Sequence, residues 1–318
     1  MVETAKVVAV TGSSGYIGSR LLQQLEEENL EKLVAFDTRP PRDPVHNIAV
    51  YRQDVGKPID NILRRHRVNA LVHLAFVRSR GRQRREVREA RESNLRTLHS
   101  VLESCTRAQV GHVIYLSSHA VYGAHRDNPV PLTELAPLRP MLDFPLSYDK
   151  FLCDQVVQSF AERRPETKVT ILRASPVLGP SAPKDASRIF GVARPLGVWR
   201  HNPPFQFLYE DDLARILAVA IQRAIAGIFN IAGDGVAFYQ EIKKLIPHPL
   251  HCMPASLAYP LTGCGWGLGL QRHRSTADLD FMRYPVILGT AKMAHATGYR
   301  LEYTSLEAVT AFANSVLC

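Results

Sequence analysis

Short apolar runs alternate with longer helical patterns along the first half of the chain. Five runs of four or five residues predict buried strands, at 6–10, 33–36, 70–74, 112–116 and 169–172. They are apolar on both faces, which is typical of strands inside a parallel sheet. Apolar residues at helical spacing predict helices over 15–28, 82–108 and 146–163. The alternation predicts an α/β fold of the Rossmann type, a doubly wound parallel sheet.

A glycine-rich turn separates the first predicted strand from the first predicted helix. It reads Thr11-Gly12-Ser13-Ser14-Gly15-Tyr16-Ile17-Gly18. The three glycines let the backbone turn tightly, approach a pyrophosphate and pack the helix against the strand. The helix N-terminus offers free N–H donors to the anion. We therefore predict a dinucleotide site that includes Gly12, Ser14, Gly15, Tyr16, Ile17 and Gly18.

Asp37 closes the second predicted strand, 19 residues after Gly18. At that distance a carboxylate can bind an adenosine ribose diol, and it would repel a 2′-phosphate, so we expect NAD rather than NADP. Arg39 weakens this preference because its charge offsets part of the repulsion. A plain turn-forming role for Asp37 is the alternative.

After residue 178, the alternation of apolar strand runs and helical patterns becomes irregular. Strand or helix patterns return at 205–208, 212–224 and 228–231, and an amphipathic helix is predicted at 305–316. We expect residues 1–178 to form the cofactor-binding Rossmann domain and residues 179–318 to form a smaller substrate-binding lobe. Within that lobe, 204–232 is expected to return to the Rossmann sheet.

Several further motifs carry a resemblance to a known family. They are Asp54-Val55, His73-Leu74-Ala75, Leu116 to Gly123 (LSSHAVYG), Phe207 to Ala214 (FLYEDDLA) and Gly227 to Gly233 (GIFNIAG). Together with the glycine-rich turn they resemble the extended short-chain dehydrogenase/reductase family, which contains nucleotide-sugar epimerases and dehydratases. The resemblance implies an NAD cofactor and a polar substrate such as a nucleotide sugar. It also implies that Asp54, Val55, Leu74 and Ala75 lie beside the cofactor.

The same resemblance implies a catalytic hydroxyl at Ser118, substrate contacts from Ser118 and Tyr122, and a lysine, Lys150, that binds the nicotinamide ribose. In the family, a tyrosine four residues before the lysine is the general acid/base. Here that position holds Leu146, which cannot carry a proton.

Tyr148 is the phenol nearest in sequence to Lys150. It stands two residues before the lysine, about 160° around a helix, so it points elsewhere unless Pro145 keeps the first turn irregular. Tyr148 therefore has two open roles, either as a proton carrier or as a packed or solvent-facing residue.

A second departure follows the predicted strand at 169–172. Arg173 to Pro180 (RASPVLGP) resembles the family's RxxNVYGP, with Pro176 in place of the asparagine that contacts substrate. The resemblance still implies that Pro176 and Val177 line the nicotinamide face. The sequence thus implies an NAD(P)-dependent oxidoreductase or epimerase with an atypical active site. The alternative is a non-catalytic dinucleotide-binding or redox-sensing protein.

Composition narrows the protein class. With 318 residues, 46% of them hydrophobic, and a net charge of +9, the chain is not a disordered or collagen-like protein. Five cysteines without a C-x-x-C pair suit a reducing compartment, so we expect no metal site and a cytoplasmic protein. The uncharged stretch 247–270, which contains Trp266, is broken by Pro and Gly, so no membrane span is expected. It is interpreted as substrate-lobe core, with a lid or a membrane-surface patch as alternatives.

Most of the positive charge lies in one stretch. The stretch from Arg64 to Arg91 contains ten arginines and two glutamates, so its net charge is +8. These arginines could clamp a small anion at the ligand edge of the sheet, or form a solvated helix face or a subunit interface, with Arg85 and Glu89 as neighbours one turn apart. Nucleic acid is disfavoured because no aromatic residue lies between Arg78 and Arg91. The resemblance further implies a homodimer through the helices at 82–108 and 146–163.

Overall fold

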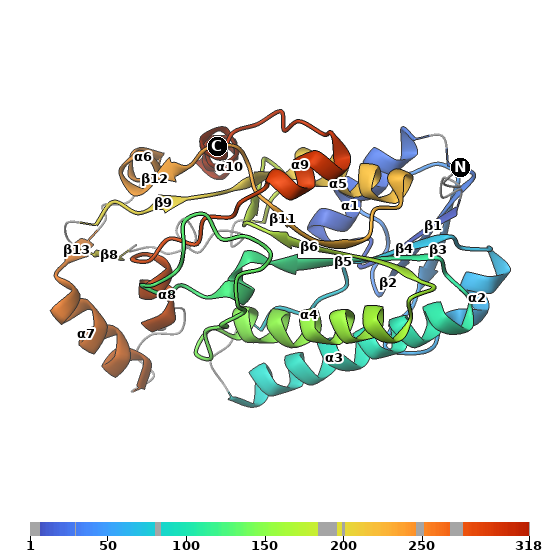
Figure 1. Ribbon diagram of the computed structural model, residues 1–318, viewed down its shortest axis with the longest axis horizontal. Coiled ribbons are helices and arrows are strands. Elements are labelled where there is room, and N and C mark those ends of the chain that lie inside the picture. Colours follow the sequence, from blue (N-terminus) through green and yellow to red (C-terminus); the bar gives the residue numbers. More distant parts are fainter. Residues whose placement is uncertain are drawn as a thin grey trace.

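The computed structural model describes residues 7–28, 30–79, 84–183, 196–198, 201–245, 251–267 and 276–317. A seven-stranded parallel sheet forms its centre, in the order β11-β6-β5-β4-β1-β2-β3. Helices cover both of its faces (Figure 1). The strand order reverses between β1 and β4, which is where doubly wound sheets form ligand sites. The predicted Rossmann-type fold is confirmed.

The strands of this sheet are apolar for a simple reason. They are β1 (Val7–Thr11), β2 (Lys32–Asp37), β3 (Ile48–Arg52), β4 (Ala70–His73), β5 (His112–Ser118), β6 (Lys168–Ala174) and β11 (Gly227–Ile231). Successive side chains point to opposite faces. In β1, Val7 and Ala9 join one buried cluster, whereas Val8 and Val10 join another. Because both faces are buried, most strand positions are apolar, and the polar ones, such as Arg173, need a buried partner.

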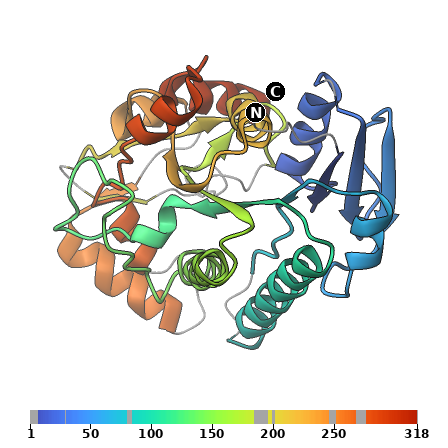
Figure 2. The ribbon, with the colours of Figure 1, turned by 45° about the vertical axis from the view of Figure 1, so that its right-hand side comes forward.

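The helices form two layers. The helices α1 (Tyr16–Glu26), α5 (Glu210–Arg223) and α9 (Ala291–Thr297) cover one face, and α2 (Asp60–Arg65), α3 (Arg84–Arg107) and α4 (Pro145–Arg163) cover the other. In Figure 2, α3 and α4 lie side by side beneath the sheet. The sequence patterns miss β3, a partly exposed edge strand, and α2, which is too short to show a helical period.

The described part of the chain beyond β6 folds mainly into short strands and helices. Its strands are β7 (Val177–Leu178), β8 (Leu196–Val198), β9 (Pro204–Phe205), β10 (Leu208–Tyr209), β12 (Ala237–Phe238) and β13 (His251–Met253), and its helices are α6 (Tyr239–Leu245), α7 (Ala255–Gly267), α8 (Thr276–Phe281) and α10 (Ser305–Leu317). The predicted strand at 205–208 is two strands, β9 and β10, with different partners. β11 lies in the main sheet, while the division into two lobes at residue 178 stays a prediction.

The charge-free stretch before residue 271 is helical in part. Helix α7 contains Pro260, and it buries Ala258 and Thr262 while Leu257 and Leu261 are more than half exposed. One face of α7 is therefore packed and the other is open, which differs from a segment buried throughout a lobe core. Among the helices in the described ranges, none is both long and apolar enough to cross a membrane.

A buried ion pair links strand β6 to helix α4 near the carboxyl edge of the sheet. Arg173 of β6 donates from Nε and Nη2 to the two carboxylate oxygens of Asp154 in α4, at 3.1 and 3.0 Å, and neither side chain is more than 2% exposed. Ser117 donates to the same carboxylate at 2.6 Å. Arg173 Nη1 also donates to the hydroxyl of Tyr122, which donates to Asn230 of β11. The network connects α4, β5, β6 and β11.

Replacing Arg173 with methionine tests how strongly the fold depends on this pair. Asp154 would remain buried without its cation, so we expect Arg173→Met to lower the free energy of unfolding by about 3 to 5 kcal/mol. Urea unfolding measures it. The control is Arg164→Met, which removes an exposed partner of Glu166 at 3.7 Å and should cost less than about 1 kcal/mol. Equal losses in the two variants would contradict the assignment.

Candidate functional site

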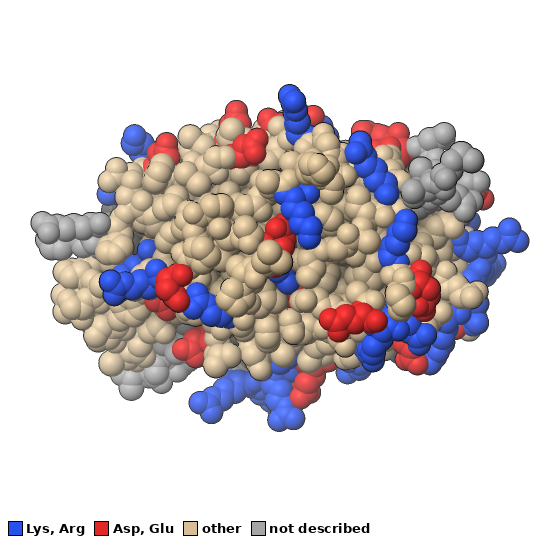
Figure 3. Space-filling model, viewed as in Figure 1, with Lys and Arg blue, Asp and Glu red and all other residues tan. Residues whose placement is uncertain are grey.

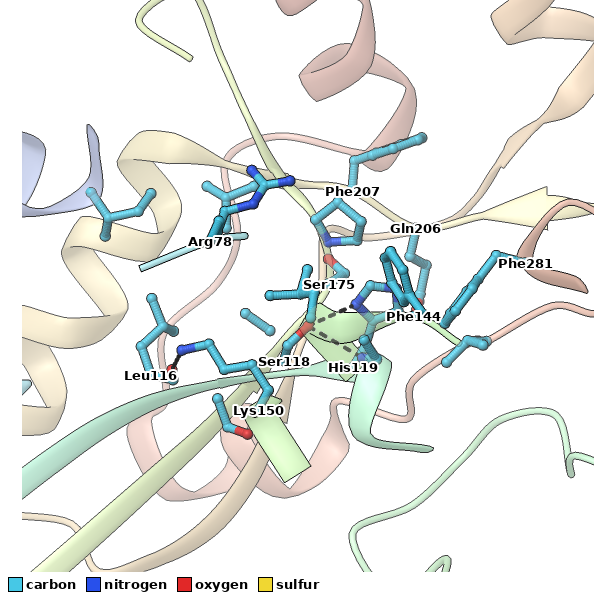
Figure 4. A pocket seen from close by; sticks show the side chains of 18 of the residues that line it. Arg78, Leu116, Ser118, His119, Phe144, Lys150, Ser175, Gln206, Phe207 and Phe281 are labelled. Carbon is cyan, nitrogen blue, oxygen red and sulfur yellow. Dashed lines mark hydrogen bonds between the residues drawn. The ribbon is translucent and has the colours of Figure 1, made fainter. Parts of the chain in front are cut away.

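A pocket of about 500 Å³ opens at the carboxyl ends of the central strands. The glycine-rich turn forms one wall, the ends of β4, β5 and β6 form the floor, and the start of α4 and the end of α8 lie opposite (Figure 4). The structure brings together these predicted site residues: Gly12, Gly15, Tyr16, Ile17, Gly18, Leu74, Ser118, Lys150, Pro176 and Val177.

The glycine-rich turn needs its glycines for packing and leaves donors open. Gly12 has φ +70°, and a Cβ there would lie 2.6 Å from the amide N of Ala75. A Cβ on Gly18 would lie 2.2 Å from the carbonyl oxygen of Gly12. Gly15 precedes α1, no side chain caps the start of that helix as described, and its first turn holds no acidic residue, although Glu210 accepts from the hydroxyl of Tyr16 at 2.6 Å. The first N–H groups of α1 are therefore available to an anion.

Asp37 connects this turn to the end of β2. Its Oδ2 accepts from the amide of Ser14 at 3.0 Å, and its Oδ1 accepts from the amide of Arg39 at 3.0 Å. The Arg39 guanidinium lies 3.7 Å from Oδ1, and the Ser14 hydroxyl donates to the Arg39 carbonyl at 2.9 Å. Asp37 thus organises the turn and also places a negative charge beside it. Both roles proposed from the sequence are compatible with this geometry.

Six residues that were predicted to bind the cofactor do not line the described walls of the pocket: Ser14, Asp37, Arg39, Asp54, Val55 and Ala75. The Asp54 carboxylate accepts from the amide of Gly56 at 2.8 Å, within its own turn. Val55 is 5% exposed and belongs to the core. The backbone of Ala75 packs against Gly12. Their part in cofactor binding stays a prediction.

Lys150 lines the pocket, and aromatic side chains surround its ammonium group. Helix α4 begins with Pro145 in its first turn, so Leu146 and Lys150 lie one turn apart, and both line the pocket. The lysine Nζ donates to the carbonyl of Leu116 at 2.7 Å and lies 4.1 Å from the ring centroid of Phe76 and 4.9 Å from that of Tyr115. Burial lowers the pKa of Lys150 to about 8. The ammonium therefore persists at neutral pH.

The two predicted tyrosines lie elsewhere. The ring of Tyr148 stacks on Phe151 at 6.3 Å, and the guanidinium of Arg91 lies 4.6 Å from its centroid. The irregular first turn that could have brought Tyr148 to the lysine is absent from α4 as described. Tyr122 is fully buried in the Arg173 network. Neither phenol lines the described pocket.

Three small polar groups converge on the floor of the pocket. Ser118 ends β5, and its Oγ accepts from the amide of Ala120 at 3.2 Å and lies 3.4 Å from Nδ1 of His119, the first residue of the 3-10 helix η1 (His119–Tyr122). Burial lowers the pKa of His119 to about 4, so the ring is neutral at pH 7. Ser175 Oγ is buried and has no hydrogen-bond partner among the described residues. All three residues line the pocket, and in Figure 4 a dashed line joins Ser118 to His119.

Sequence reasoning missed His119 and Ser175. For His119 a signal existed, because a titratable residue directly follows the strand-end serine of a recognised motif. For Ser175 there was none, since the importance of its hydroxyl depends on a burial that composition cannot report. Both residues line the pocket.

Most of the described basic run lies outside the pocket. Arg85, Arg88 and Arg91 pair with Glu89, Glu92 and Asp149 at 2.6 to 2.7 Å. Figure 3 shows basic side chains gathered over the start of α3. Arg78 alone of the described arginines in this run lines the pocket, and Arg80 and Arg82 lie outside the described residues. Within the described ranges no group of acidic, histidine or cysteine side chains is arranged to hold a metal ion.

A family comparison identifies the chain's relatives. The model of the NAD dependent epimerase/dehydratase family matches residues 8–232. The match covers more than half of the chain, and the chain therefore belongs to this family. The resemblance drawn from the sequence motifs is confirmed, and the expected cofactor agrees with the family's description.

Individual relatives are distant. An uncharacterized protein of Mycobacterium tuberculosis is 27% identical over 318 residues, covering 95% of this chain and 82% of its own length. A UDP-glucose 4-epimerase of Erwinia amylovora is 28% identical over 178 residues, and the match covers 52% of each chain. The chain thus spans about half the length of that epimerase.

Solved structures share the fold. A UDP-glucose 4-epimerase from Thermotoga maritima with UDP-glucose superposes with a TM-score of 0.73 at 19% identity, covering 98% of both chains. A UDP-N-acetylglucosamine 4-epimerase from Methanobrevibacter ruminantium in complex with UDP-N-acetylmuramic acid gives 0.75 at 18% identity and covers 99% of both. At this identity the likeness supports the architecture.

The lowered pKa of Lys150 predicts a measurable pH dependence of stability. Below pH 8 the folded protein carries a desolvated ammonium, so Lys150→Met should be more stable than the natural protein, by up to about 3 kcal/mol. Between pH 8 and about 10.4, the model-peptide value for lysine, the unfolded chain binds the extra proton, so the natural protein gains stability as pH rises and the difference shrinks. Thermal unfolding from pH 6 to pH 10 tests this.

The control for that experiment is Lys57→Met, because Lys57 is exposed. The difference in stability between Lys57→Met and the natural protein should not change over the same pH range. A constant difference for Lys150→Met as well would show that Lys150 keeps an ordinary proton affinity in the folded state.

Proposed function

We propose that this member of the NAD dependent epimerase/dehydratase family is an oxidoreductase that binds NAD along the carboxyl edge of its sheet. Its second ligand would be oxidised or reduced at a carbon–oxygen group in the same pocket. The observation that carries the proposal is that the uncapped start of α1, Lys150 and Ser118 share one pocket. An anion site, a cation and a hydroxyl are the groups that a dinucleotide and a reacting oxygen require.

The residues fit a dinucleotide in order along the sheet edge. The first turn of α1 would hold the pyrophosphate, and Asp37 would accept from the adenosine ribose. Lys150 keeps two N–H groups beyond its bond to Leu116 and would donate to the nicotinamide ribose. Val177 and Pro176 supply an apolar surface for the nicotinamide face. Bound NAD supplies a hydride acceptor, and NADH a hydride donor.

The proton must travel without a tyrosine. Oxidising an alcohol to a carbonyl releases a hydride from carbon and a proton from oxygen, and Leu146 accepts neither. Ser118 Oγ would orient the oxygen by a hydrogen bond, and the neutral ring of His119, with Nδ1 3.4 Å from Oγ, would position the serine hydroxyl. Lys150 in its amine form would take the proton, and its ammonium would return one during carbonyl reduction. A pKa of about 8 suits both directions near neutrality.

A non-catalytic dinucleotide-binding protein is the second candidate. One observation favours it, namely that a leucine side chain faces the pocket where the family's tyrosine would stand. Such a protein would bind NAD through the same turn and would transfer no hydride. The two candidates therefore share their first test and differ in the second.

The first test is NAD binding measured by isothermal titration calorimetry. A charge-assisted hydrogen bond is lost in Lys150→Met, so we expect its dissociation constant to rise about tenfold or more. In the natural protein the same constant should rise as pH passes 8, because the ammonium is lost there. Lys57→Met should bind NAD normally. If NAD does not bind at all, both candidates are wrong.

The second test concerns Tyr148. Tyr148→Phe keeps the ring that packs between Arg91 and Phe151, so NAD affinity and any formation of NADH should equal those of the natural protein. The near-ultraviolet absorbance of NADH, followed with a panel of nucleotide sugars and simple alcohols, measures the reaction. Turnover that Tyr148→Phe abolishes would make this phenol the proton carrier. NAD binding without turnover of any compound would favour the non-catalytic protein.

A further inference from the structure

We infer that the second ligand of this pocket is an uncharged aromatic secondary alcohol, or its ketone, rather than a nucleotide sugar. The inference rests on the proposed function, since it names the substrate class of that same site. Three features of the described walls support it: aromatic and aliphatic side chains in the same pocket as Ser118, few free polar groups, and little charge.

Apolar side chains surround the hydroxyl of Ser118. Phe144, which precedes α4, and Phe281, at the end of α8, have ring centroids 5.2 Å apart with the planes tilted by 59°. The imidazole of His119 meets Phe281 edge-on at 6.0 Å (Figure 4). Leu146 adds an aliphatic wall where the family's tyrosine would present a phenol. An aromatic ligand can extend such a cluster by stacking or by edge-to-face contact.

The polar groups left free in the described walls suffice to hydrogen-bond a single oxygen atom of a ligand. Ser175 Oγ is buried without a partner among the described residues, and Ser175 and Ser118 both line the pocket. The amide of Gln206 is already used, since its Oε1 accepts from the Leu288 amide at 2.7 Å and its Nε2 donates to the Leu288 carbonyl at 3.3 Å. Two hydroxyls suit a single carbinol or carbonyl. A sugar buried here would leave several of its hydroxyls unsatisfied, which is costly.

Charge in the described walls is low. The charged lining residues are Arg78, Lys150 and Asp278, of which one is acidic and one is assigned to the cofactor. A nucleoside diphosphate moiety is usually held by several cations or by bidentate arginines. The arginines of α3 that could have done this pair with acidic side chains on the outer surface. The walls therefore favour an uncharged ligand.

Two probes in non-reacting complexes test the inference. Acetophenone is titrated into the NAD+ complex of the full chain, and UDP-glucose into the NADH complex, so that neither pair can exchange a hydride. Calorimetry measures both affinities. We expect saturable binding of acetophenone and no saturable binding of UDP-glucose over the same concentrations.

Variants locate the bound probe. Phe281→Ala should raise the dissociation constant of acetophenone about tenfold or more, because an aromatic wall is lost. Phe281→Leu keeps most of the apolar volume, should fold if the alanine variant does not, and should weaken binding less. Phe238→Ala is the matched control, since this exposed ring lies outside the described pocket walls. NAD+ affinity, measured first on each variant, should stay unchanged.

Three results would overturn the inference while leaving the proposed function standing. They are tighter binding of UDP-glucose than of acetophenone, binding of NAD+ but of neither probe, and acetophenone binding that Phe281→Ala and Phe281→Leu leave unchanged. Failure of the natural protein to bind NAD+ is distinct, because it removes the proposed function and this inference with it.

Discussion

The buried pair of Arg173 and Asp154 is the constraint on which the ligand edge depends. Removing two charges from water is expensive, and the cost is recovered only when every remaining donor and acceptor is satisfied. Here the carboxylate also accepts from Ser117, and the guanidinium also donates to Tyr122. Three members of the network are near neighbours of pocket residues: Asp154 stands one turn after Lys150, Ser117 directly precedes Ser118, and Arg173 stands two residues before Ser175. A structure that satisfies the pair therefore also sets the relative positions of the ammonium and the two hydroxyls.

The features that depend on interactions between residues close in sequence could be predicted from the sequence. The features that depend on tertiary packing could not. Strands buried on both faces and the glycine-rich turn depend on local chemistry, so their positions were predicted within one to three residues. Strand β3, half-exposed at the sheet edge, lacks that pattern. The direction of Tyr148 required knowing that α4 is regular from Pro145, and the free hydroxyl of Ser175 required knowing what surrounds it. Tertiary packing decides both.

Charge illustrates the same point. The net charge of +9 left open an anionic partner at the ligand edge, a solvated helix face and a subunit interface. In the folded chain, helical geometry places Arg85 opposite Glu89 and Arg88 opposite Glu92, one turn apart on an exposed face. Exposed pairs of this kind are screened by solvent and contribute little to stability. The pocket itself is lined mainly by apolar groups, so the sign of the whole chain says little about what the pocket binds.

Leu146 stands where the family has a tyrosine. This replacement links the two unusual properties of the pocket, its apolar walls and the low pKa of Lys150. A phenol one turn before Lys150 would offer the ammonium a polar neighbour and the substrate a proton. A leucine offers neither, and with Phe76 and Tyr115 packed around Nζ, the lysine remains desolvated and its pKa falls to about 8. The dry environment that excludes a sugar's hydroxyls is thus the same one that brings the lysine close to neutrality, where an amine exchanges protons efficiently. In the proposed reaction, the loss of the family's acid/base and the presence of a substitute have one physical origin.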